Sequence, residues 1–257
     1  ALYRGEWETA YKILKKTNDF PEFTGRICPA LCEKSCVLYL TTGQAVTNRE
    51  NECAIAERAF LEGYVTIENP ERNGKKVAVL GAGPAGLATA NQLNYKGFEV
   101  TVFDKNEAAG GLLRYGIPNF KLDKHIIDRR IKVMEQEGVK FVYNTTISLE
   151  KLAAQDFTEE NAVLAGFDAY VVSTGTPVAR DINIPGRELK GVHLALELLS
   201  QQNRVLAGME FSKEERVTAK GKNVLVIGGG DTGSDCIGTS HRQGCKSVTQ
   251  IEIMPKP

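Results

Sequence analysis

The 257-residue chain has little that would place it on a membrane or on nucleic acid. It contains no run of about 18 uncharged apolar residues, so no membrane-spanning helix is predicted. Its 32 basic residues balance 32 acidic ones, which indicates neither a nucleic-acid-binding patch nor a charged tail. The first residues, ALYRGEWETAYK, lack the apolar core of a signal peptide. We therefore expect the cytosol as the compartment, or an organellar stroma or matrix if a longer parent chain carries a transit peptide.

Histidine is also scarce. The three histidines, His125, His193 and His241, are far apart in sequence and have no neighbour in a catalytic pattern. No Ser/His/Asp set and no paired carboxylates stand out either. We therefore predict no catalytic acid–base residue, and we expect the histidines to lie on the surface or to serve in packing.

The N-terminal residues, up to about 70, show no strand pattern. Trp7, Ala10, Tyr11 and Leu14 share one helical face, and CAIAERAFLEGYV (53–65) continues with helical spacing. Between these two helices we expect a cysteine-bearing loop that is opened by a proline and a glycine, Pro21 and Gly25.

Short apolar runs alternate with helical patterns from residue 77 onward. Continuous apolar strands of this kind are typical of a parallel sheet covered on both faces. Helices are expected from Pro84 to just before Gly97 and again around Ile127, where the charges of DKHIIDRRIK (123–132) should lie on a solvated face. The expected strands are VAVLG (77–81), EVTVFD (99–104), KFVYN (140–144), AYVVSTG (169–175), NVLVIG (223–228) and SVTQIEIM (247–254).

The first glycine turn follows the first of these strands. It is a full GxGxxG, made of Gly81, Ala82, Gly83, Pro84, Ala85 and Gly86. In this motif the glycines allow a tight turn, a close approach to a pyrophosphate, and close packing of helix on strand. The following helix offers free N–H groups to the phosphates. Asp104 ends the next strand, eighteen residues beyond Gly86, where an acidic side chain accepts hydrogen bonds from a ribose. A glycine turn that serves packing alone is the alternative.

A second turn has the same spacing and also follows a strand. Its residues are Gly228, Gly229, Gly230, Asp231, Thr232 and Gly233. Glu252 lies nineteen residues beyond Gly233, and an acid at this place favours the free 2′-OH of NADH. Lys256 could instead meet the 2′-phosphate of NADPH, so the nicotinamide preference stays open.

Cysteines gather in the segment CPALCEKSC, which supplies Cys28, Cys32 and Cys36. Thiolates at this spacing suit an iron–sulfur cluster, which takes about four ligands of this type. Cys53, Glu52 or cysteines upstream of Ala1 could complete the set. A zinc site and unligated structural thiols are the alternatives. The remaining two, Cys236 and Cys245, are expected to be buried small apolar residues.

Together these patterns predict an α/β protein with two dinucleotide-binding units of the Rossmann-like, doubly wound type, preceded by a small helical iron–sulfur region. A doubly wound domain has about six strands, and the second unit supplies two, so we expect it to be incomplete. The predicted boundaries are an iron–sulfur region at 1–70, an FAD-binding part at 71–190, a helical connection at 191–218, and the start of an NAD(P)H-binding domain at 219–257.

Two dinucleotide sites in one chain suggest a bound flavin dinucleotide and a visiting nicotinamide, with hydride passing between them. Thr174 and Gly175 close the strand AYVV at the strand end where cofactors bind in open α/β sheets. A relay of this kind needs no acid–base residue at the transfer step, because the protein positions the cofactors and tunes them.

The sequence also resembles the small (beta) subunit of glutamate synthase, or the equivalent C-terminal region of single-chain forms. The resemblance extends over essentially the whole chain. It rests on the stretches FPEFTGRICPALCEKSC, NECAIAERAF, VAVLGAGPAGLA, GGLLRYGIPNFKLDK, VVSTGTP, GGGDTGSDCIGTSHRQG and IEIMPKP.

The resemblance implies an FAD domain, an NAD(P)H domain and a helical region that carries two [4Fe-4S] clusters. Hydride would pass from NAD(P)H to FAD, and electrons would continue through the clusters to the FMN of a large (alpha) subunit that makes glutamate from glutamine and 2-oxoglutarate. The implied cluster ligands are Cys28, Cys32 and Cys36, with Glu52 ranked above Cys53. The implied FAD residues are Gly81, Gly83, Gly86, Asp104, Gly111, Arg114 and Thr174. On the NAD(P)H side they are Gly228, Gly230, Asp231, Thr232 and Gly233.

Two departures from the family pattern matter. The family has a further cysteine motif upstream of ALYRGEW, and its chain continues well past PKP. We therefore expect this sequence to be about half of a functional unit. A related FAD and iron–sulfur oxidoreductase with another acceptor, and an inactive FAD-binding fragment, remain as alternative interpretations.

Overall fold

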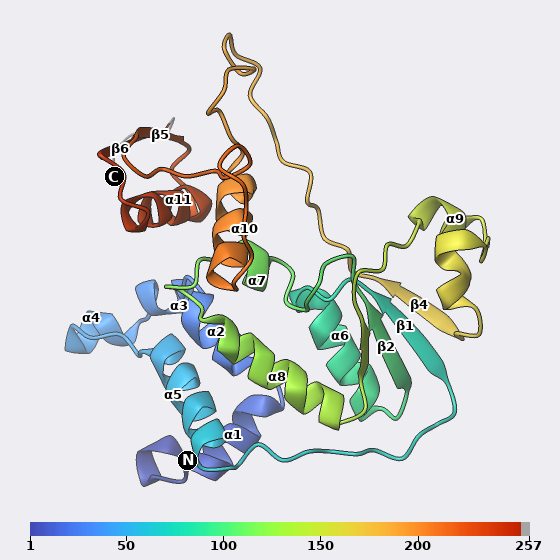
Figure 1. The fold of residues 1–257 in the computed structure, drawn as a ribbon. Coiled ribbons are helices and arrows are strands. Elements are labelled where there is room, and N and C mark those ends of the chain that lie inside the picture. The colour runs from blue at the N-terminus through green and yellow to red at the C-terminus, as the bar shows by residue number, and fades with distance from the viewer. Residues whose placement is uncertain (253–257) are drawn as a thin grey trace. The chain divides into compact units, whose positions relative to one another are not determined.

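The computed structural model describes residues 1–252 and divides into two compact units. The first consists of Ala1–Ala109 and Lys121–Thr174, and the second of Gly110–Phe120 and the residues from Gly175 onward. Figure 1 shows the elements of each. The first compact unit contains both the N-terminal helices and the first glycine turn, so it does not correspond to one predicted region. The predicted domain boundaries at residues 70, 190 and 218 remain predictions.

The first unit begins with short helices. Residues 1–61 form a 3₁₀ turn and five α-helices: η1 (Leu2–Arg4), α1 (Trp7–Lys15), α2 (Pro21–Ile27), α3 (Leu31–Lys34), α4 (Leu38–Thr42) and α5 (Asn48–Leu61). The predicted loop is wrong over its first residues, because Pro21 starts the helix α2 instead of opening a loop. Proline suits the first helical position, since it has a fixed φ and needs no N–H partner there.

A close contact between helices α2 and α5 organises this region. A side-chain carbon on Gly25 of α2 would lie 2.7 Å from the backbone nitrogen of Cys53 in α5 and 2.8 Å from its Cα. Only a residue without a side chain allows the two backbones to approach this closely. Gly25 is therefore a packing residue of a helix pair.

A parallel four-stranded sheet forms the rest of the first unit. Its strands are β1 (Lys76–Leu80), β2 (Glu99–Phe103), β3 (Lys140–Val142) and β4 (Ala169–Val172), in the order β3-β2-β1-β4. Val79 of the central strand pairs with Val102 of β2 and with Val171 of β4. These strands match the apolar runs of the sequence, and their order is that of a doubly wound dinucleotide-binding unit.

Helices cover both faces of this sheet. Helices α6 (Pro84–Tyr95) and α8 (Lys124–Gln136) lie on one side, and α9 (Leu149–Ala153) lies on the other (Figure 1). On the α9 side, Ala78, Leu80 and Phe103 form a buried core with Leu164 of the 3₁₀ turn η2 (Glu159–Leu164). Coverage of both faces explains why β1 is buried from Val77 to Leu80.

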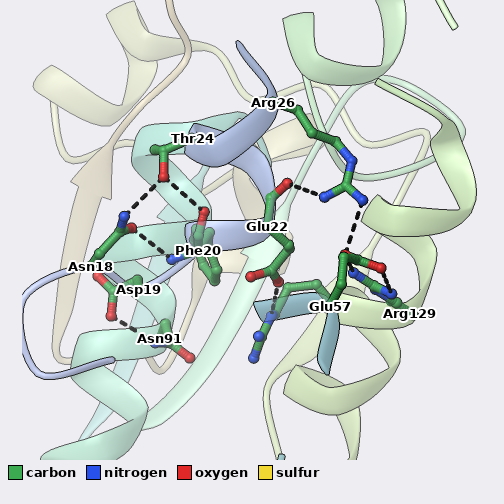
Figure 2. A network of polar contacts seen from close by, with 10 residues as sticks. Asn18, Asp19, Phe20, Glu22, Thr24, Arg26, Glu57, Asn91 and Arg129 are labelled. Carbon is green, nitrogen blue, oxygen red and sulfur yellow. Dashed lines mark hydrogen bonds and ion pairs between the residues drawn. The ribbon is translucent and has the colours of Figure 1, made fainter. Parts of the chain in front are cut away.

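The predicted solvated face of DKHIIDRRIK is wrong at two positions. Arg130 is 1% exposed and binds the buried carboxylate of Glu22 in α2. Arg129 is partly buried against Glu57 of α5 (Figure 2). The N-terminal helices cover this side of α8. A periodicity argument on α8 alone could not identify the two partners, which lie more than 70 residues away in the sequence.

The second unit contains α7 (Leu112–Tyr115), α10 (Ala195–Leu206), β5 (Asn223–Ile227), α11 (Asp231–Arg242) and β6 (Ser247–Ile251). Strands β5 and β6 pair in parallel, and Leu199, Val226 and Cys236 form a core between them and the helices. Asn203 of α10 donates hydrogen bonds to the carbonyls of Arg114 and Ile117, both at 2.9 Å. The glycine-rich segment 110–120 therefore packs with this unit.

The described part of the chain contains no helix with the length and apolar character needed to cross a membrane. All six cysteines are free thiols. Cys236 is buried as predicted, and burial raises the pKa of this thiol to about 11. Cys245 is only partly buried, and its Sγ lies 3.8 Å from Nδ1 of His241.

Candidate functional site

The first glycine turn joins β1 to α6 and has no room for a side chain at Gly81 or Gly86. Gly81 has a φ of +108°, and a side-chain carbon there would overlap the carbonyl oxygen of Ser173 and lie 3.1 Å from the Cα of Thr174. A side-chain carbon on Gly86 would overlap the carbonyl oxygen of Gly81. The turn thus brings the end of β4 against the end of β1. Thr174 lies where the sequence predicted it, beside the turn.

Helix α6 directs its N-terminus out of this turn. Gly83 is its N-cap and Pro84 its first residue, and Ala85 follows in the first turn. No side chain caps the helix, so its first backbone N–H groups are available to a ligand. Such an end attracts a phosphate, because the helix dipole adds positive potential to the N–H donors.

Asp104 lies directly beside the same turn and is 8% exposed. One carboxylate oxygen accepts from the backbone N–H of Ala82 at 2.7 Å. The other accepts from the backbone N–H and the side-chain amide of Asn106, at 2.8 and 2.9 Å. Asp104 is therefore oriented by the turn, and its contact with a ribose stays a prediction. The sequence argument missed Asn106, which the pattern D-x-N just after a strand could have indicated.

The second glycine turn joins β5 to α11. Gly228 has a φ of +118°, and a side-chain carbon on Gly233 would overlap its carbonyl oxygen. The side-chain amide of Gln250 also donates to that oxygen, at 2.8 Å. Gly230 is the N-cap of α11, and Asp231 and Thr232 form its exposed first turn. The two turns of the chain thus share the same local construction.

Glu252, at the end of β6, reaches this second turn. A side-chain carbon on Gly229 would overlap the Glu252 carboxylate, so Gly229 leaves room for that acid. The position is the one predicted for a ribose-binding acid. Lys256, the residue that would favour a 2′-phosphate, lies outside the described residues.

Gly111 and Arg114 were predicted on the FAD side. They belong to the second unit, where Gly111 is the N-cap of α7 with a φ of +50° and Arg114 lies inside that helix. Asn203 holds the backbone of Arg114 there. Their contact with a flavin remains a prediction, and so does that of Gly175, which begins the next stretch of the same unit.

The three predicted cluster cysteines follow helix α2. Cys28 and Cys32 are exposed and Cys36 is partly exposed. The sulfur of Cys28 accepts from the backbone N–H of Ala30 at 3.4 Å, and that of Cys32 from the side-chain amide of Asn48 at 3.7 Å. N–H groups that donate to a cysteine sulfur are typical of the surroundings of a metal-bound cysteine.

Backbone N–H groups donate hydrogen bonds to the sulfur of Cys36 as well. Hydrogen bonds from Val46, Leu38 and Tyr39 hold the pKa of the Cys36 thiol below its usual value. The donor set therefore fits a thiolate-bound metal group. In residues 1–252, however, no three His, Cys, Asp or Glu side chains are gathered closely enough to hold a metal ion. The ligand assignment stays a prediction.

The two candidates for a fourth ligand differ in their surroundings. The carboxylate of Glu52 accepts from Asn18 at 3.3 Å and from Thr24 at 3.4 Å. Cys53 packs against Gly25, and burial raises the pKa of its thiol. The ranking of Glu52 above Cys53 stays a prediction.

Comparison with known families accounts for both parts of the chain. The model for the pyridine nucleotide-disulphide oxidoreductase family matches residues 75–257. The chain belongs to this oxidoreductase family. Residues 1–63 of the chain match a second model, described as dihydropyrimidine dehydrogenase domain II, 4Fe-4S cluster. The predicted fold class is confirmed.

The chain is similar over nearly its full length to glutamate synthase chains. It is 48% identical over 256 residues to the NADPH glutamate synthase small chain of Bacillus subtilis, covering 99% of this chain and 50% of that one. It is 44% identical over 257 residues to the NADH glutamate synthase of Schizosaccharomyces pombe, covering 100% of this chain and 12% of that one. The predicted resemblance is confirmed. The chain spans about half the length of the small chain it matches.

Solved structures agree on the fold. The chain superimposes on a 2-naphthoyl-CoA reductase with a TM-score of 0.53 and 23% identity, covering 84% of this chain and 29% of that one. At this identity the likeness concerns the fold alone.

Proposed function

We propose that the chain is the electron-input part of a glutamate synthase. When bound, the cofactors would supply hydride transfer from NAD(P)H to FAD and onward electron transfer through a 4Fe-4S cluster. The observation that carries the proposal is the presence, in one chain, of two glycine turns of the same construction behind a cysteine segment with N–H donors on its sulfurs. Resemblance to glutamate synthase chains supports this acceptor over others.

In this proposal the first turn holds FAD. The free N-terminus of α6 binds the pyrophosphate, and Gly81 and Gly86 keep the turn narrow enough for the backbone to reach it. Asp104 accepts from the ribose through lone pairs left beside its contacts with Ala82 and Asn106. The family resemblance assigns four further residues to the FAD: Thr174, Gly175, Gly111 and Arg114.

The second turn would hold the nicotinamide nucleotide. The exposed first turn of α11, with Asp231 and Thr232, faces solvent at the end of β5, as a site for a visiting cofactor requires. Glu252 is the acid placed to accept from the adenosine ribose. The matched relatives include chains named for NADPH and for NADH, so the proposal covers both nucleotides.

Cys28, Cys32, Cys36 and Glu52 are the ligands proposed for the cluster. A large glutamate synthase subunit or domain is the partner proposed to accept the electrons. With that partner the parent protein would contribute to ammonia assimilation and glutamate formation.

The test is a visible spectrum of the anaerobically purified protein before and after NADPH or NADH, with analysis of released flavin, iron and sulfide. Bound FAD that bleaches on addition of either nucleotide supports the proposal. FAD that does not bleach indicates a flavin-holding fragment. Absence of both flavin and iron from the parent-length protein contradicts the proposal.

A second candidate keeps the cofactors but changes the acceptor. It is favoured by the match of residues 1–63 to a dihydropyrimidine dehydrogenase domain. Copurification of the parent protein with a large amidotransferase-type subunit, or a shared reading frame with one, would decide for glutamate synthase.

A further inference from the structure

Helix α2 leads directly into the cysteine segment. It ends at Ile27, and Cys28 is its C-cap. Any contact that fixes α2 therefore also fixes the start of the segment that carries the proposed cluster ligands. The contacts of α2, and of Asp19 just before it, reach both helices on one side of the parallel sheet, α6 and α8 (Figure 2).

The central contact is a buried ion pair between Glu22 of α2 and Arg130 of α8. The two side chains are 0% and 1% exposed, and Nε of Arg130 donates to Oε1 of Glu22 at 2.5 Å. Burial by itself lowers the pKa of Arg130, but the Glu22 carboxylate outweighs burial and keeps the pKa raised. The guanidinium lies over the rings of Phe20 and Phe60, so aromatic side chains complete its surroundings.

A second ionic contact runs beside the first. Arg129 of α8 forms a two-pronged ion pair with Glu57 of α5, and its Nη1 lies 2.9 Å from Oε2. Arg26 of α2 binds the same carboxylate at 3.0 Å and donates to the carbonyl of Glu22 at 2.8 Å. Helices α2, α5 and α8 are thus joined through Glu57.

A third contact reaches the helix of the first glycine turn. Asp19, just before α2, accepts from the side-chain amides of Asn91 and Gln92 in α6, at 2.9 and 2.5 Å. Helix α6 begins at Pro84, in the turn proposed to hold the FAD pyrophosphate. The segment that leads into the cysteines is therefore tied to α6, which begins at the first glycine turn, and to α8.

We propose that the Glu22–Arg130 pair positions the cysteine segment relative to the first dinucleotide turn, and thereby sets the rate at which electrons leave the flavin for the cluster. The inference rests on the proposed function. Glu22 and Arg130 are positioning residues, since neither carries a ligand or lies in the glycine turn. A buried ion pair suits this task better than an apolar contact, because its attraction depends on direction as well as on burial.

The test compares Glu22→Gln with the wild type in the parent-length, cofactor-loaded protein. We expect amide hydrogen exchange across residues 21–36 to accelerate by about tenfold or more, because that segment opens more readily. Rapid mixing with NADPH should give unchanged flavin bleaching. Cluster reduction, followed by freeze-quench EPR, should slow severalfold, because the rate of electron transfer falls steeply as the distance between flavin and cluster grows.

Two further variants control the comparison. Glu8→Gln removes an exposed ion pair with Lys12 on α1 and should change neither exchange nor rates. Glu22→Met combined with Arg130→Met removes the pair while keeping an apolar, folded interface, which guards against a single variant that does not fold. It should still accelerate exchange and slow cluster reduction.

Unchanged exchange over residues 21–36 in the folded double variant would overturn the inference, whatever the cofactors do. Slowed flavin bleaching in parallel with slowed cluster reduction would overturn it as well, because a general loss of structure would then explain both. Failure of the wild type to reduce its cluster would contradict the proposed function instead. The hydrogen-exchange measurement would still test whether the Glu22–Arg130 pair positions residues 21–36.

Discussion

Gly86 of α6 lies against the carbonyl oxygen of Gly81, so closely that a side-chain carbon at residue 86 would overlap that oxygen. The contact closes the first dinucleotide turn, and it involves two backbones. A side-chain carbon on residue 86 and the carbonyl oxygen of Gly81 could not move apart, as the end of a long side chain could, without a shift of the backbone. The third glycine of the motif is therefore required by packing, and its loss should affect the cofactor through the shape of the turn.

Gly86→Ala should lower the free energy of unfolding by about 1–3 kcal/mol, the usual cost of overpacking, and should weaken FAD binding. Chemical denaturation and flavin titration would measure the two effects. Gly230→Ala is the matched control, since a side-chain carbon at Gly230 would meet no other atom within 4 Å and the backbone there is extended, with a φ of −72° and a ψ of −179°. The control should leave stability and FAD affinity unchanged, and equal losses in both variants would contradict the packing argument.

Replacement of Asp104 tests whether the acid shapes the turn as well as binding a ribose. Asp104→Ala removes the acceptor for the N–H of Ala82 and for Asn106. Hydrogen bonds to a charged group are worth about 1.5–3 kcal/mol, so the free energy of unfolding should fall by about that amount even without FAD. Asp104→Asn keeps an acceptor oxygen and should lose less. Chemical denaturation of the flavin-free variants measures this loss. An unchanged denaturation midpoint for Asp104→Ala would refute a structural role of Asp104.

Gly25→Ala should separate α2 from α5. The added carbon would lie 2.7 Å from the backbone nitrogen of Cys53, and about 1–3 kcal/mol of stability should be lost. The double change Gly25→Ala with Cys53→Ala should not restore it, because the closest atoms belong to the Cys53 backbone. Thermal unfolding of the single and double variants measures this. Full recovery in the double variant would show that the contact involves only the thiol side chain.

The Glu57 network should make stability depend on pH. Partial burial raises the pKa of Glu57, but hydrogen bonds and charge from Arg129 and Arg26 outweigh burial and hold the pKa below its usual value. A carboxyl with a lowered pKa stabilises the folded state at pH values above its unfolded-state pKa, and this contribution disappears as pH falls through the folded-state pKa. The wild type should therefore lose stability below about pH 4.5, the ordinary value of a glutamate.

Glu57→Gln should remove part of that acid dependence and lower stability at neutral pH. Denaturation midpoints between neutral and acidic pH would show it as a shallower slope. Glu150, an exposed glutamate on α9, provides the control as Glu150→Gln. A slope unchanged by Glu57→Gln would mean that other carboxyls carry the acid dependence.

Local pattern was sufficient for the sheet and for both glycine turns. Strands β1, β2, β5 and β6 begin within a residue of the predicted runs, and α6 starts at Pro84 as expected. The reason is physical: an apolar run that must be covered on both faces, followed by glycines at positions that allow no side chain, leaves few alternatives to a strand and a dinucleotide turn. The positions of Asp104 and Glu252 beside the turns follow from the same unit.

Contacts between segments that are distant in sequence could not be predicted from local pattern. Arg130 belongs to a charged stretch that resembles a solvated helix face, and its burial depends on Glu22, 108 residues earlier. Segment 110–120 lies in the sequence between β2 and β3 of the first sheet, but it packs with the second unit through Asn203. Periodicity reports which face of an element is apolar, and it contains no information about which remote charge or amide will meet that face. Such pairings arise only when the chain folds, because the free energy of burying a charge depends on the partner that folding brings to it.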